Sequence, residues 1–177
     1  AFHWIDPGIS YAKAARLLRP AGWLVLMSNT HAAGGTHTSE PFVGRLRGLH
    51  DRLAPEVGAW TFPAARDIQR RTADDGDIAT VWAQVERRLS DPPDVSELFE
   101  PPRVRTYPWV ASYDRDGYLA MLASQSSYAL MDPARRGELL DGIGRLVDDL
   151  LGGAVSKQYV TVVAAARNSS APGAGAE

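Results

Sequence analysis

The chain has 177 residues, a length that fits one ordinary domain with its own hydrophobic core. Hydrophobic residues make up 45% of it and charged residues 23%, which excludes a fibrous or wholly disordered chain. The formal net charge of −2 comes without a basic stripe for a nucleic-acid backbone, and the lack of cysteine excludes disulfides, thiolate metal sites and cysteine nucleophiles.

The sequence also bounds the location of the protein. No apolar run approaches the ~18 residues of a membrane helix, and the first residues lack the basic and then apolar order of a signal peptide. We therefore expect a cytoplasmic protein with neither membrane nor nucleic acid among its partners. The chain opens without methionine on a run of large side chains at residues 2–4, so we expect a segment to be missing upstream.

The first predicted elements are a helix and a strand. Residues 8–19 are rich in helix formers, with apolar side chains at every third or fourth position. A Pro-Ala-Gly turn ends this helix, and the apolar run 23–27 is typical of a strand buried on both faces. We expect a polar loop over 28–41, and loops at that end of an open α/β sheet are where ligands bind.

The middle of the chain alternates helices with proline-rich segments. Helices are expected over 42–54 and 64–90, each with its arginines on a solvated face. Two proline pairs, at 92–93 and 101–102, exclude long regular structure between them. Residues 103–110 alternate like a half-exposed strand, and the proline within that strand places it at a sheet edge.

The last part of the chain predicts two helices and a strand. The helices are expected over 114–131 and 133–151, with Asp132 as the N-cap of the second and a Gly-Gly pair at its end. Residues 158–166 are the strongest strand signal, and a disordered tail is expected over 169–177.

Four stretches carry a likeness to a known family. Residues 1–6 read Ala-Phe-His-Trp-Ile-Asp, and residues 15–24 read Ala-Arg-Leu-Leu-Arg-Pro-Ala-Gly-Trp-Leu. Together with residues 109–113 and the strand 158–166, they resemble class I S-adenosylmethionine-dependent methyltransferases that act on small molecules. The first is similar to the family's segment after its fourth strand, and the second to its turn into the fifth strand, with Ala21 replacing a glycine. The other two resemble the family's sixth and seventh strands.

The family's glycine-rich turn after a first strand, and the acidic residue that ends its second strand, have no counterpart in this sequence. The resemblance therefore implies an α/β fold over residues 1–168, a partial Rossmann-like methyltransferase sheet flanked by helices. Its last strand would be antiparallel and its first three strands absent. An apolar sheet edge would then be exposed beside strand 23–27, which predicts a homodimer, a strand swap or a longer parent protein.

The resemblance implies a cofactor-binding role for Phe2, His3 and Trp4 at the methionine end of S-adenosylmethionine. There the Trp4 indole would attract the sulfonium through a cation–π contact. A core aromatic pair at a strand end is the alternative for His3 and Trp4. Asp6 would orient a substrate or cap the following helix, and capping is the favoured role.

The substrate-binding residues implied on the acceptor side are Asn29, Trp109, Tyr113, Ser126 and Tyr128. Apolar walls with a few hydroxyls suit a small-molecule pocket, although packing alone would also explain the residues from Trp109 to Tyr128, and Tyr128 in particular. His31 is the candidate general base for an acceptor hydroxyl, and the alternative is a solvent-exposed loop histidine. The gap between His31 and His37 fits no zinc spacing, so no metal is expected.

The sequence thus predicts methyl transfer from S-adenosylmethionine to a small organic acceptor, by the acceptor-side half of an enzyme. Such transfer depends on alignment and on exclusion of water more than on a fixed side chain. The alternative is a non-catalytic binding or assembly module that lost the cofactor site. An all-helical regulator is disfavoured by the two apolar strand runs.

Overall fold

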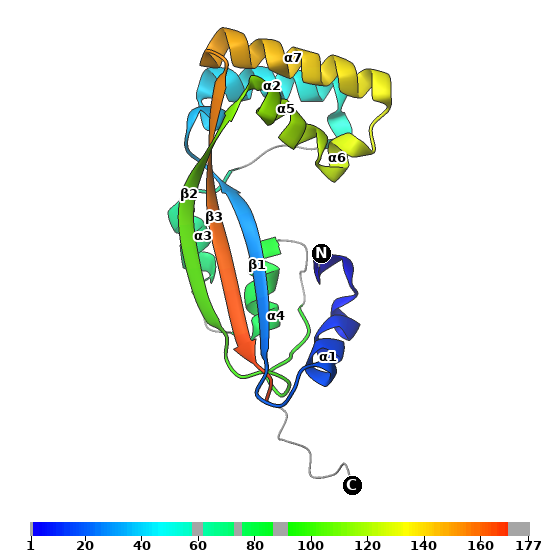
Figure 1. Cartoon of the computed structure of the whole chain (residues 1–177), viewed down its shortest axis with the longest axis vertical. Helices are drawn as coiled ribbons and strands as arrows, with labels where there is room; N and C mark the ends of the chain where they lie inside the picture. Colours follow the sequence, from blue (N-terminus) through cyan, green and yellow to red (C-terminus); the bar gives the residue numbers. More distant parts are fainter. Residues whose placement is uncertain (1, 58–61, 73–75, 87–91, 170–177) are drawn as a thin grey trace. The chain divides into compact units, whose positions relative to one another are not determined.

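The computed structural model describes residues 2–57, 62–72, 76–86 and 92–169. Within them one antiparallel sheet has the order β1-β3-β2 (Figure 1). Its strands are β1 (Trp23–Ala32), β2 (Arg103–Asp114) and β3 (Ala154–Arg167). The fold is therefore α/β with an antiparallel last strand, and β2 lies at an edge as its Pro108 predicts.

Two predictions about strand β1 are wrong. Residues 28–32 continue the strand instead of starting a loop, because an antiparallel strand with one solvated face accommodates polar side chains. The apolar run is also not buried on both faces, since Trp23, Val25 and Met27 are 45%, 56% and 68% exposed. The three side chains share one face of β1 through the period of two, and the described residues leave this face uncovered.

The chain divides into two compact units. The first comprises residues 1–30, 65–108 and 160–177, and the second comprises residues 31–64 and 109–159. Each strand of the sheet therefore contributes residues to both units.

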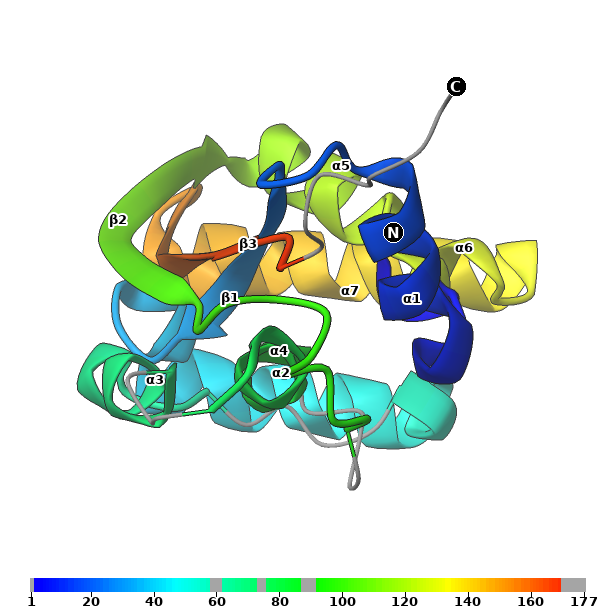
Figure 2. The same cartoon turned by 90° about the horizontal axis from the view of Figure 1, so that it is seen from below.

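The first unit holds the 3-10 helix η1 (Phe2–Trp4) and the helices α1 (Pro7–Leu17), α3 (Ala65–Thr72) and α4 (Ile78–Glu86). Helices α3 and α4 pack together (Figure 2), so the prediction of one helix over 64–90 is wrong. The Asp77 carboxylate accepts from the Thr80 amide at 2.8 Å and caps a new helix there. Residues 73–75 and 87–90 lie outside the described residues.

The second unit holds six helical segments around one core. They are η2 (Thr36–Thr38), α2 (Glu40–Leu53), η3 (Pro55–Val57), α5 (Arg115–Ala123), α6 (Ser126–Ala129) and α7 (Pro133–Leu151). Helices α2 and α5 both pack on α7. Helix α2 comes close to α7 at Gly142, where a Cβ would lie 3.1 Å from a methyl of Leu49. The core joins Phe42, Leu46, Tyr118, Leu122, Leu139, Ile143, Val147 and Val155.

Local capping explains the helix boundaries of the second unit. The Asp132 carboxylate accepts from the amides of Ala134 and Arg135, and Gly152 ends α7 in the left-handed conformation at φ 65°, both as predicted. The single helix expected over 114–131 is instead two helices. It breaks at Ser124, whose hydroxyl donates to the Met121 carbonyl at 2.7 Å and competes with the helical ladder.

The start of the predicted tail is ordered. Asn168 is buried and its amide side chain donates to the Ala15 carbonyl at 2.9 Å, while the Ser169 amide donates to the Leu98 carbonyl. Residues 170–177 of the tail lie outside the described residues. Across the described ranges, no helix combines the length and the apolar character needed to cross a membrane.

Candidate functional site

Four side chains of the second unit, from all three strands, meet around the Tyr159 ring. The His31 ring lies edge-on at 4.9 Å between centroids, and the Trp109 ring stacks at 4.8 Å. The Tyr113 hydroxyl is 3.3 Å from the Tyr159 hydroxyl. We call His31, Trp109, Tyr113 and Tyr159 the aromatic cluster. The structure thus brings together three residues that the sequence predicted for the acceptor side.

The loop after β1 adds a second imidazole beside this cluster. His37 is buried, and its Nδ1 lies 2.9 Å from the Tyr118 hydroxyl. Phe62 contacts both imidazoles, His37 edge-on at 4.9 Å and His31 in a stacked arrangement at 6.4 Å. The loop needs glycine at position 35, because φ is 71° there and a Cβ would lie 2.4 Å from the Ser156 carbonyl oxygen.

Besides Tyr159, sequence reasoning also missed Lys157. Its side chain is 0% exposed, and its Nζ lies 5.5 Å from the Tyr159 ring centroid. Among the described residues, Nζ has no hydrogen-bond partner. The sequence held a signal for this burial, because Lys157 shares a strand face with Val155 and Tyr159 through the period of two.

Burial controls the protonation of the three basic groups. Burial, and after it the Lys157 charge, lower the pKa of His31 to about 4 and that of His37 to about 3. Burial also lowers the pKa of Lys157 to about 8. Both imidazoles are therefore neutral at pH 7, so His31 can accept a proton, but only as a weak base.

His31 is consequently not a solvent-exposed loop histidine. It belongs to strand β1, is half-buried, and packs against two aromatic rings. The tyrosine hydroxyl beside it stays neutral, because burial, and then the hydrogen bond with Tyr113, raise the pKa of Tyr159. The arrangement offers aromatic surfaces for stacking, one neutral imidazole and one ionisable amine.

Two other residues predicted to bind the acceptor, Tyr128 and Ser126, lie in helix α6 and not in the aromatic cluster. The Tyr128 hydroxyl donates to His50 Nε2 at 2.8 Å, because the Nδ1–H of the neutral His50 donates to the Leu46 carbonyl at 2.9 Å. Burial lowers the pKa of His50, which keeps this tautomer neutral. Tyr128 is fully buried in the helical core, and Ser126 is exposed at the start of α6.

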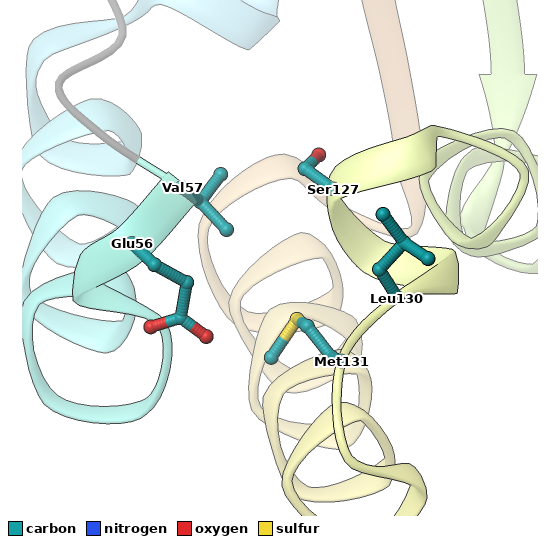
Figure 3. Close-up of a pocket in the computed structure, with 5 residues that line it drawn as sticks. All are labelled: Glu56, Val57, Ser127, Leu130 and Met131. Atoms are coloured by element: carbon teal, nitrogen blue, oxygen red, sulfur yellow. The ribbon is translucent and has the colours of Figure 1, made fainter.

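A small hollow lies beside these helices. Its volume is about 200 Å³, below the roughly 300–1,000 Å³ of ligand pockets. Figure 3 shows Glu56 and Val57 on one wall and Ser127 and Leu130 on the other. Glu56 is already ion-paired with Arg135 at 3.2 Å. The aromatic cluster is therefore the better candidate site.

The residues predicted to bind cofactor lie in the first unit. Phe2 packs edge-on against the Tyr11 ring at 5.1 Å, and Trp4 is 69% exposed. The side chain of His3 lies outside the described residues. The Asp6 carboxylate accepts from the Gly8 amide at 2.9 Å, which confirms the capping role.

The remaining substrate prediction in the first unit is Asn29. Its side-chain oxygen accepts from the Thr161 hydroxyl at 2.7 Å on the neighbouring strand. No group of three His, Asp or Glu side chains in the described ranges is placed to hold a metal ion. No protein-family model matches the chain, and no curated protein sequence matches it.

Proposed function

We propose that the chain is the acceptor-side part of a class I S-adenosylmethionine-dependent methyltransferase that acts on a small organic molecule. The observation that carries the proposal is the convergence of His31, Trp109 and Tyr113 on Tyr159. Aromatic surfaces orient a small acceptor and keep water from it, and methyl transfer depends on both effects. The neutral His31 imidazole is the candidate acceptor of the proton from the attacking group.

The sheet gives further support. Its last strand is antiparallel to both neighbours, in agreement with the resemblance. The exposed side chains of Trp23, Val25 and Met27 lie on one face of the edge strand β1, and they agree with an apolar surface that a further part of the protein would cover.

The described residues do not form a complete site for S-adenosylmethionine. Gly34 and Gly35 have positive φ after a strand, yet Gln158 and Ser156 already fill the space beside them. The Asp6 carboxylate is used by its own helix, and the Trp4 indole is exposed, so it is able to face a sulfonium. The proposal therefore requires a second copy of this chain to complete the adenosine site, and we assign no chemical step to the cofactor.

Isothermal titration of S-adenosylhomocysteine into the purified chain tests this proposal. Micromolar binding supports it, and no heat at millimolar ligand contradicts it for this polypeptide. A parallel titration with S-adenosylmethionine isolates the sulfonium. Trp4→Ala should reduce the preference for S-adenosylmethionine over S-adenosylhomocysteine by about 2–30-fold, the equivalent of a cation–π contact of ~0.5–2 kcal/mol.

Trp23→Ala is the matched control for that variant. Trp23 is also an exposed indole of the first unit, but its ring faces the Arg103 guanidinium at 5.5 Å. We expect it to leave the preference between the two ligands unchanged. An equal effect of both substitutions would remove Trp4 from the cofactor site.

A non-catalytic assembly module is the second candidate, and the exposed apolar residues of the edge strand β1 favour it. In this alternative a second copy of the chain packs on the exposed face of β1 and covers Val25 and Met27. Sedimentation equilibrium at rising concentration tests it, and a clean monomer at the highest concentration would exclude it.

A further inference from the structure

The choice of lysine at position 157 is unusual for this chain. The sequence contains only two lysines, Lys13 and Lys157, and the other basic residues in its count of 19 are arginines. Lys13 is exposed on helix α1, whereas Lys157 is fully buried. An arginine would stay charged at every accessible pH, while a lysine can lose its proton when buried. The buried position therefore holds an amine that can switch between charged and neutral, which an arginine could not do.

No acidic residue compensates this amine within the described residues. Lys157 Nζ has no hydrogen-bond partner there, and burial alone accounts for its lowered pKa. The ionisable groups that face it are His31 from β1, His37 from η2 and Tyr159 from its own strand. All three are neutral at pH 7, so a charged Lys157 leaves one uncompensated positive charge in an aromatic surrounding.

We propose that Lys157 anchors the carboxylate of a small aromatic acceptor, whose ring packs against the aromatic cluster. A monoanion fits because it balances one ammonium, while a phosphate dianion would leave a surplus negative charge in a site that is poor in water. The aromatic body follows from the exposed Trp109 ring stacked on Tyr159, since flat rings are the partners that such surfaces prefer. This inference names the acceptor class and rests on the proposed function.

Binding of the carboxylate would also act on His31. The Lys157 charge is one of the two causes of the low pKa of His31. A bound carboxylate cancels that charge, so the pKa of His31 would rise and the imidazole would become a stronger base when the acceptor is present. Because Nζ is closed off from solvent, the carboxylate reaches it only when the surrounding rings rotate.

The two lysines make a direct test possible. In protein labelled with ¹³C at lysine Cε, NMR resolves one signal for Lys157 and one for Lys13, which is the internal reference. Benzoate is the probe and benzamide the uncharged control. Saturating benzoate should shift the Lys157 signal and raise the pH at which it titrates by about one unit, the equivalent of tenfold tighter binding to the ammonium form. Benzamide should leave that pH unchanged.

Affinity measurements with variants complete the test. Lys157→Met keeps the apolar stem and should weaken benzoate binding at least tenfold, while benzamide binding stays the same. Lys13→Met is the matched control and should change neither. As the pH rises past the pKa of about 8, the benzoate dissociation constant should rise by about tenfold in total and then level off.

The inference is overturned if benzoate fails to shift the Lys157 signal, or if Lys157→Met binds benzoate as tightly as the wild type. An equal shift with inorganic phosphate at the same concentration would overturn the aromatic carboxylate and leave a simple anion site. All these measurements omit S-adenosylmethionine. They therefore succeed or fail separately from the titrations that test the proposed methyltransferase.

Discussion

Replacing Lys157 by methionine should stabilise the protein. The pKa of the buried amine is about 8, against 10.5 for an ordinary lysine. This difference corresponds to about 3 kcal/mol by which folding is disfavoured while the amine stays charged. Methionine fills a similar volume without charge, but it loses the contact with the Tyr159 ring, which at a desolvated site is worth about 2 kcal/mol. We therefore expect Lys157→Met to raise the free energy of unfolding at pH 7 by about 1 kcal/mol.

The sign of the pH dependence follows from the lowered pKa. Between the folded value of about 8 and the unfolded value of 10.5, the folded state binds fewer protons than the unfolded state. The stability of the wild type therefore rises with pH across this window, and below it the full penalty applies. The advantage of Lys157→Met should accordingly shrink as the pH rises from 8 to 10.5.

Urea unfolding followed by circular dichroism measures both effects, provided that the m-values of the two proteins agree. Lys13→Met is the control, because Lys13 is exposed and its loss should change stability by less than about 0.5 kcal/mol. A Lys157→Met protein that is less stable than the wild type at pH 7 would refute the reasoning, since it would mean that the buried ammonium has a compensating partner.

Three further outcomes are expected. The wild type should lose about 3 kcal/mol of stability as the pH falls from 6.5 to 4, because the folded pKa of His31 is about 4. His31→Phe keeps the ring contacts and should not show this loss. Acid titration of the circular dichroism signal measures the difference. Asp132→Ala removes the cap of α7 and should lower the free energy of unfolding by about 1 kcal/mol in urea. Met27→Lys places a charge on the exposed face of β1 and should weaken any self-association in sedimentation equilibrium, whereas Lys13→Met should not.

Elements fixed by local chemistry were predictable from the sequence. Helix α7 has the expected bounds because its cap, its first proline and its terminal glycine act within a few residues of one another. The edge position of β2 follows from the missing amide hydrogen of Pro108. The burial of β1 was not predictable in this way, because it depends on which strands and helices lie beside it.

For the candidate site, too, the residue types were predictable from the sequence and their arrangement in space was not. The aromatic and imidazole residues attracted attention through their chemistry, but their meeting point at Tyr159 depends on the register of three strands. Lys157 was missed because the predicted strand began at residue 158, one position too late to include it. Strand β3 starts at residue 154, so the period of two places Lys157 on the buried face with Val155 and Tyr159.

The two effects expected of Lys157→Met have opposite signs, and that opposition separates function from structure. A lysine retained for packing would support both stability and ligand binding, so its loss would weaken both. A lysine retained to meet an anion should cost stability in the free protein, and its loss should strengthen folding while weakening benzoate binding. A penalty of about 3 kcal/mol is large beside the 5–15 kcal/mol that holds a domain folded, and a methionine would avoid it. The amine at this position is therefore better explained by what it binds than by what it packs against.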